Sequence, residues 1–298
     1  MTLMVADEEL KSQLQRVLAS VEQLLPKAVD KVDWGNNWAA NWRSYSFSGY
    51  LEAINELDPV TLDDLLGIDK QKQTLEENTQ QFVQGFPSNN VLLWGTRGTG
   101  KSTLVRALLN AYAEKGLRVI QVDKDDLVNL ADIFAAIKGE PYRFIIFCDD
   151  LSFEPGESSY KVLKSALDGA VYAAPEYVCF YVTSNRRHLL PEYETDNLGF
   201  KMVNNELHAG EGVEEKTSLS DRFGLWVPFH IFSQDQYLEL VQQLVENYSR
   251  EYQIKVILGD ELDQAALKWS HQKSKRCGRT ALQFSRYWVG QQLSKRSK

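Results

Sequence analysis

The residues of this chain best suited to chemistry form a short glycine-rich run that begins at Gly95. Four residues separate Gly95 from Gly100, and Lys101 and Ser102 follow directly, which is the spacing of a phosphate-binding P-loop. Glycines let the backbone turn so that its N–H groups face phosphate oxygens, and a helix N-terminus adds partial positive charge. The lysine supplies a cation for the β- and γ-phosphates, and the serine hydroxyl is an oxygen ligand for Mg²⁺. The predicted phosphate-binding residues are Gly95, Thr96, Arg97, Gly98, Thr99, Gly100, Lys101, Ser102 and Thr103.

Polar residues that follow two apolar runs extend this predicted site. Asp149 and Asp150 directly follow the run 143–148. An acid at the end of a buried strand beside a P-loop can hold Mg²⁺. We expect that role of Asp149, and we expect Asp150 to polarise the attacking water. The alternative is a pair of acids that caps a helix. The run 177–182 leads to Asn185, which we expect near the γ-phosphate because parallel strands end at the same sheet edge. A turn-forming asparagine is the alternative there.

The elements that must position these residues follow from hydrophobic periodicity. Five apolar runs alternate with helical patterns, which is typical of a parallel sheet covered on both faces. Pro228 indicates that the last run is an edge strand. From residue 236 onward the periodicity is only helical. The five runs are 91–94, 118–122, 144–148, 177–182 and 225–230.

Composition bounds the class of protein. The net charge is −8 and 43% of the residues are hydrophobic, which argues against a surface built wholly for nucleic acid. No apolar run reaches the roughly 18 residues of a membrane span and no signal pattern is present, so we expect a cytoplasmic protein with no membrane partner. Cys148, Cys179 and Cys277 are too scattered for a disulfide framework or a zinc cluster. We expect Cys148 and Cys179 to be core residues.

The two ends of the chain leave alternatives open. Residues 7–25 have the spacing of an amphipathic helix. Tryptophans at positions 34, 38 and 42 fit packing onto the body of the protein, and they also fit a partner-docking face. The segment 264–298 has nine basic residues and no acid, which fits a solvated surface or a nucleic-acid contact. Between 188 and 219 we expect a mobile loop.

The order of these motifs resembles that of AAA+ ATPases. The P-loop, the strand ending in two acids and the strand ending in asparagine are followed by Ser220-Asp221-Arg222-Phe223-Gly224 and by a helical tail with Gly278-Arg279-Thr280. Within that superfamily the chain most resembles a bacterial family of ATPases without an assigned cellular role. The closer likeness lies in residues 87–93, 149–153, 183–189 and 218–225, and the resemblance covers about residues 60–292.

The resemblance implies an α/β P-loop NTPase (AAA+) fold. Its sheet would be five-stranded and parallel, with the P-loop strand in the middle, and a helical C-terminal lid would follow it. The first 57 residues lie outside the superfamily's core pattern, and we expect them to form a helical N-terminal extension because of the helical spacing at 7–25. The turn signal Asp58-Pro59 places the first domain boundary. The expected domains are an aromatic-rich helical extension at 1–57, an AAA+ nucleotide-binding domain at 58–233, and a helical lid with a basic tail at 234–298.

The resemblance also implies roles for residues outside the P-loop. Leu65, Leu66, Gly67 and Ile68 would lie near the adenine of ATP. Arg222 matches an arginine finger given to a neighbouring subunit of a homo-oligomeric ring such as a hexamer, and a surface pair with Asp221 is the alternative. Arg279 matches a lid arginine that contacts the γ-phosphate within its own subunit. The expected cofactors are ATP and Mg²⁺.

The resemblance favours an ATPase that hydrolyses ATP to remodel or load an unidentified protein or nucleic-acid partner. The superfamily usually has Glu where this chain has Asp150, and a shorter acid reaches water less well. A slow or non-hydrolysing ATP-dependent assembly switch is therefore the second hypothesis. The third hypothesis is a P-loop kinase. The expected helical lid and arginine finger fit a subunit interface of an ATPase better than they fit a kinase.

Overall fold

The structure is a computed structural model. It describes residues 13, 16, 31–45, 48–154, 157–168, 174–187, 189, 201–203, 206–208 and 219–296. Residues 13 and 16 are both helical. The rest of the helix predicted at 7–25, and most of the loop predicted at 188–219, lie outside the described residues.

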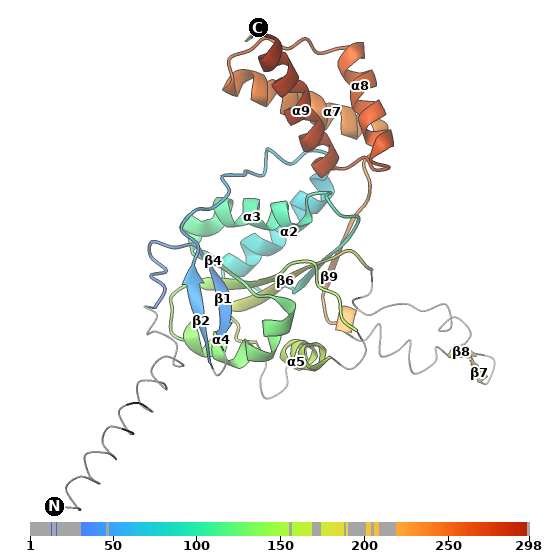
Figure 1. The fold of residues 1–298 in the computed structure, drawn as a ribbon. Coiled ribbons are helices and arrows are strands. Elements are labelled where there is room, and N and C mark those ends of the chain that lie inside the picture. Colours follow the sequence, from blue (N-terminus) through green and yellow to red (C-terminus); the bar gives the residue numbers. More distant parts are fainter. Residues whose placement is uncertain are drawn as a thin grey trace, which may run out of the picture.

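A seven-stranded sheet forms the centre of the molecule (Figure 1). Its strand order is β2-β1-β4-β5-β6-β3-β9, and every neighbouring pair is parallel except β1 with β2. The strands are β1 (Ala39–Tyr45), β2 (Ser48–Ala53), β3 (Val91–Gly95), β4 (Leu117–Gln121), β5 (Arg143–Cys148), β6 (Val178–Ser184) and β9 (Leu225–Phe229). A separate short hairpin joins β7 (Lys201–Val203) to β8 (Glu206–His208).

The sheet confirms the five predicted strands and corrects three expectations. It has seven strands because the aromatic-rich segment supplies β1 and β2, so the expected helical extension is wrong for Ala39–Tyr45 and Ser48–Ala53. A four-residue spacing suits one face of a strand as well as a helix, and aromatic residues favour strands. The P-loop strand β3 lies between β6 and β9 rather than in the middle. The strand with Pro228 occupies the edge beside it, as the missing N–H of proline requires.

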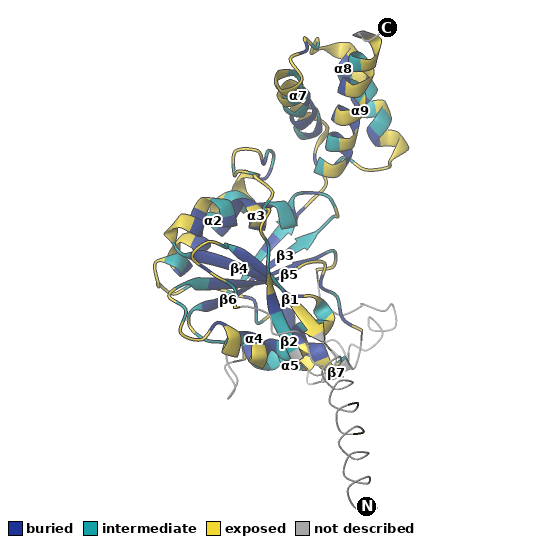
Figure 2. Cartoon of the chain, turned by 60° about the vertical axis from the view of Figure 1, so that its left-hand side comes forward, coloured by how far each residue is buried: buried dark blue, intermediate teal, exposed yellow. Residues whose placement is uncertain are grey.

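Helices cover both faces of the sheet. On one face lie α2 (Asp69–Val83) and α3 (Lys101–Tyr112), and on the other lie α4 (Leu130–Ala136) and α5 (Ser158–Leu167) (Figure 2). Short 3₁₀ helices occupy Ala113–Lys115 and Lys124–Asn129. Successive strand side chains point to opposite faces, so one cluster of buried residues contains Leu93 and Ile145 and the other contains Leu92 and Ile146.

Three further helices form the lid beyond one end of the sheet (Figure 1). They are α7 (Gln234–Glu251), α8 (Asp260–Gln272) and α9 (Gly278–Arg296). Ser233 begins α7 with a capping box that pairs it with Gln236, which satisfies N–H groups of the first turn. Leu240, Val241 and Val245 are buried in the same apolar cluster as α2 and α3. Among the described helices, none is long and apolar enough to cross a membrane.

All three cysteines are buried and free. Burial raises the pKa of the Cys148 thiol and of the Cys179 thiol to about 12. Thiols with so little thiolate are poor nucleophiles. The burial of Cys148 and Cys179 confirms the prediction that these two are core residues.

A buried arginine fastens the tryptophan segment to the body of the protein. Trp34 and Trp42 are each 3% exposed, which confirms the packing interpretation for these two side chains. Arg118 is 4% exposed and its Nε donates to the Trp34 carbonyl at 2.8 Å. Its Nη1 donates to the carbonyls of Ala113 and Leu117 at 2.8 and 2.7 Å. One side chain thus satisfies carbonyls from two separate parts of the chain.

We predict that Arg118→Met destabilises the fold by about 3 kcal/mol, because methionine keeps much of the stem but leaves buried carbonyls without donors. Urea titration measures this as a change in the free energy of unfolding. The control is Arg43→Met, which removes a half-exposed pair with Glu52 and should cost at most about 1 kcal/mol. Equal losses for the two variants would contradict this role of Arg118.

Candidate functional site

The P-loop turns tightly over the end of β9. The Thr96 N–H donates to the Phe229 carbonyl at 3.0 Å. A Cβ at Gly95 would lie 2.1 Å from that same carbonyl oxygen, and Gly95 has φ of 125°. Gly98 and Gly100 also have positive φ angles, of 80° and 102°. Residues that carry a side chain rarely adopt this backbone conformation. The sequence of glycines therefore sets the path of the loop into the first turn of α3, where N–H groups lack helical partners.

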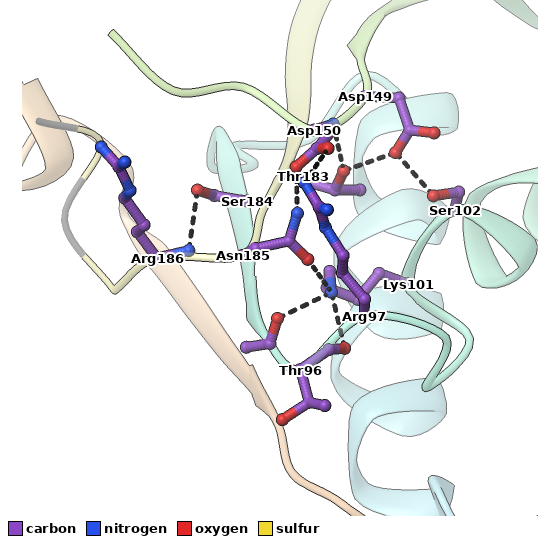
Figure 3. Close-up of polar contacts among 11 residues, drawn as sticks. Thr96, Arg97, Lys101, Ser102, Asp149, Asp150, Thr183, Ser184, Asn185 and Arg186 are labelled. Atoms are coloured by element: carbon purple, nitrogen blue, oxygen red, sulfur yellow. Dashed lines mark hydrogen bonds and ion pairs between the residues drawn. The ribbon is translucent and has the colours of Figure 1, made fainter. Parts of the chain in front are cut away.

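Lys101 lies beneath this loop and is 7% exposed. Its Nζ donates to the carbonyls of Gly95 and Thr96, both at 2.9 Å, and to Asn185 Oδ1 at 3.4 Å (Figure 3). Burial lowers the pKa of Lys101 from its ordinary 10.5, while the carboxylates of the two acids after β5 raise it. A partly desolvated ammonium held in this way is well placed to gain an anionic partner.

Thr183 links the two acids that follow β5. Its hydroxyl donates to Asp149 Oδ1, and the Ser102 hydroxyl donates to the same oxygen at 2.6 Å. The Asp150 N–H in turn donates to Thr183 Oγ1 at 2.8 Å (Figure 3). The sequence analysis did not assign this bridging role to Thr183. The signal was its spacing of two from Asn185, because alternate residues of an extended chain point to the same side.

Asp150 adopts a left-handed backbone conformation, with φ of 55°, which is uncommon for a residue other than glycine. Its carboxylate accepts from Asn185 Nδ2 and from Arg97 Nη2 at 2.9 Å. The helix that follows the two acids, α5, has Glu157 as its N-cap residue. The helix-capping alternative for Asp149 and Asp150 is therefore wrong.

A cavity of about 800 Å³ lies between the P-loop and the lid. Leu65, Leu66 and Ile68 line it, whereas Gly67 does not, and the Gly67 carbonyl accepts from Gln236 Nε2 at 3.4 Å. The P-loop residues that line it are Arg97, Gly98, Thr99, Gly100, Lys101, Ser102 and Thr103. Sequence reasoning missed the apolar wall contributed by Val60, Phe232, Leu240, Leu244 and Leu282. A mixed polar and apolar lining of this kind suits a nucleotide.

The lid helix α9 begins directly on the P-loop. The Arg279 N–H donates to the Gly98 carbonyl at 3.1 Å, and Arg279 lines the cavity. A Cβ at Gly98 would lie 3.0 Å from both Arg279 Cβ and Cys277 Sγ. The predicted lid arginine is therefore next to the predicted phosphate loop.

Arg222 lies apart from this group. It precedes β9 in a short turn, it does not line the cavity, and its Nε donates to Asp168 Oδ1. The Arg222 guanidinium thus forms an ion pair with Asp168. Within its own chain Arg222 is thus not part of the cavity.

The oxygen atoms of Ser102 and Asp149 suit a magnesium ion. Mg²⁺ prefers oxygen ligands, and proteins often hold it through one or two carboxylates together with water and phosphate. The serine hydroxyl and the carboxylate are hydrogen-bonded to each other at 2.6 Å at the rim of the phosphate loop. The two residues fit the ion by chemistry and by position.

Comparisons with known proteins agree with this architecture. The sequence model of a family described as "Protein of unknown function (DUF815)" matches residues 35–292. The replication factor C large subunit of Methanococcus maripaludis is 29% identical over 136 residues, which cover 41% of this chain and 28% of that protein.

Two solved structures share the fold. The Thermotoga maritima RuvB Holliday junction branch migration motor is 19% identical with a TM-score of 0.51, covering 76% of this chain and 63% of that one. The Aeropyrum pernix ORC1 protein, solved in complex with DNA, is 15% identical with a TM-score of 0.53, covering 78% and 62%. The chain thus spans less than two thirds of each of these relatives. The comparisons show an AAA+ P-loop fold.

We predict that Gly95→Ala destabilises the chain by about 2 kcal/mol more than Gly139→Ala. Both glycines have positive φ, so both variants carry the left-handed strain of about 1–2 kcal/mol. A Cβ at Gly139 meets nothing within 4 Å, whereas one at Gly95 collides with the Phe229 backbone, which adds a packing cost. Thermal unfolding measures the difference. Equal melting temperatures would contradict the close approach of the loop to β9.

Proposed function

The chain belongs to the DUF815 family, and from that premise we propose that it is an AAA+ ATPase that binds ATP with Mg²⁺ and hydrolyses it. The observation that carries this proposal is the meeting of Lys101, Ser102, Asp149, Asp150 and Asn185 at one cavity. These are the cation, the metal ligands, the acid and the amide that phosphoryl transfer to water requires.

Each residue has a separate part in this proposal. The N–H groups of the loop and the ammonium of Lys101 bind the phosphates, and Ser102 and Asp149 hold Mg²⁺, which neutralises phosphate charge when bound. Asp150 accepts a proton from the attacking water. Asn185, within 3.4 Å of Lys101 Nζ, orients the water or the terminal phosphate. Arg279 contributes positive charge from the lid.

The surroundings of Asp150 keep the slower alternative open. Both of its carboxylate oxygens accept bonds from this chain, one from Arg97 and the other from Asn185. An acid that is short by one methylene and already engaged is a weak base for water. An ATP-dependent switch that assembles on binding and turns over slowly is therefore our second candidate.

We propose that the partner is a macromolecule and that the chain works as a homo-oligomer. The relatives named above include a branch migration motor and a protein solved with DNA, which favours nucleic acid as one partner class. The acid-free segment 264–298 is the part of this chain that fits such a partner by charge. We retain the division at 1–57, 58–233 and 234–298 as a proposal, with β1 and β2 of the first segment completing the sheet.

We predict that Lys101→Ala weakens binding of a fluorescent ATP analogue by about tenfold or more, because a charge-assisted contact to phosphate is lost. Asp150→Asn should keep binding and lower the rate of phosphate release by about a hundredfold or more, since a general base is removed. The control is Lys124→Ala, which removes a cation paired with Glu157 outside the cavity. Unchanged affinity in Lys101→Ala would refute the assignment of the phosphate site, and parental turnover in Asp150→Asn would refute the assigned base.

We predict that Arg222 completes the active site of a neighbouring subunit. In its own chain it pairs with Asp168 outside the cavity, and an arginine delivered across an interface accelerates phosphoryl transfer by on the order of 10³-fold. Arg222→Ala and Lys101→Ala should each be nearly inactive alone. Mixing them should restore part of the phosphate release, because some interfaces then join an intact Lys101 to an intact Arg222. No recovery at any ratio, with subunit exchange shown separately, would exclude the role in trans.

A further inference from the structure

The side chain of Arg97 makes a contact that the proposed roles do not use. Arg97 belongs to the P-loop, yet its guanidinium extends past Lys101 to the acid that follows β5 (Figure 3). Its Nη2 lies 2.9 Å from Asp150 Oδ2, and the other oxygen of the same carboxylate accepts from Asn185. The acid proposed as the base is therefore held on both oxygens by donors from this chain.

The position of Arg97 brings it near two anionic sites. Its backbone belongs to the loop that faces phosphate, and its charge lowers the pKa of Lys101, so the two cations lie close enough to repel each other. A phosphate beside Lys101 therefore attracts Arg97 as well. The guanidinium has five donors in a planar fork that fits phosphate oxygens, and so it can exchange a carboxylate for a phosphate.

The contact between Arg97 and Asp150 is weak enough for such an exchange. The two side chains are 65% and 53% exposed, and ion pairs with that much exposure contribute little to stability. The Asp150 backbone is fixed by the Thr183 hydroxyl, so loss of Arg97 leaves the acid in place. The only change is that Asp150 Oδ2 loses its hydrogen bond from Arg97.

We propose that Arg97 is a positioning residue that holds Asp150 until a γ-phosphate competes for its guanidinium. The inference rests on the proposed function and adds a way in which the chain distinguishes ATP from ADP. A diphosphate lacks the group that competes most directly with the carboxylate, so the pair persists and the acid stays engaged. A triphosphate releases one oxygen of Asp150 for water.

A double-mutant cycle on binding tests this proposal without any need for turnover. The measured quantity is the ratio of the Kd for ADP to the Kd for a non-hydrolysable ATP analogue, both with Mg²⁺, by calorimetry. The four chains are the wild type, Arg97→Ala, Asp150→Asn and the double variant. Asp150→Asn frees Arg97 and should raise this ratio about three- to fivefold more in the wild-type background than in the Arg97→Ala background. Direct repulsion between Asp150 and phosphate is present in both backgrounds and cancels.

Arg106→Ala is the matched control for this cycle. Arg106 lines the same cavity but pairs with Asp58, so its effect should be additive with that of Asp150→Asn. The same change in ratio with and without Arg97 would overturn the inference and leave the proposed function intact. A wild-type chain that binds neither nucleotide would overturn both.

Discussion

The carboxyl ends of adjacent parallel strands meet at one edge of the sheet, and the whole candidate site depends on that constraint. In the order β5-β6-β3, Cys148 pairs with Val182 and Trp94 pairs with Ser184. One residue further along, Asp149 is therefore level with Thr183 and Gly95 is level with Asn185, so the register alone brings these two pairs to the same edge of the sheet. Hydrogen bonds from Ser102 and Thr183 then fix the acid. These side chains stay close together because the core buried on both faces of the sheet fixes the register of its strands.

The same edge also determines where the lid can sit. The first turn of α9 donates to the P-loop carbonyl at Gly98, and Gly278 has no side chain where a Cβ would come within 3.1 Å of that oxygen. The apolar side of α7 packs in the cluster that contains α2 and α3. Lid and loop thus share a backbone contact as well as an apolar core. If a bound anion displaced the loop, it would also move Arg279, because the Arg279 N–H is bonded to the Gly98 carbonyl.

The sequence predicts the parts of this site that lie close together along the chain. The P-loop, the acids after β5, Asn185 after β6 and the edge strand with Pro228 all follow from spacing and periodicity. Contacts between residues far apart in the chain did not follow. The pairs Arg97 with Asp150 and Arg222 with Asp168 depend on which rotamers reach across neighbouring elements. The strands β1 and β2 were missed because a spacing of four does not distinguish a strand from a helix, and Gly49, which leaves room for the Trp42 ring, has no local signature.

The most direct measurement of the central claim is a crystal structure of the full chain with Mg²⁺ and a non-hydrolysable ATP analogue. The account predicts phosphates wrapped by the N–H groups of residues 96–102, with Mg²⁺ on the Ser102 hydroxyl and bound to Asp149 directly or through water. Leu66 and Ile68 should then lie along the base, inside the cavity that the lid closes. Phosphates bound away from Lys101, or a metal ion that contacts neither Ser102 nor Asp149 through any ordered water, would contradict the account.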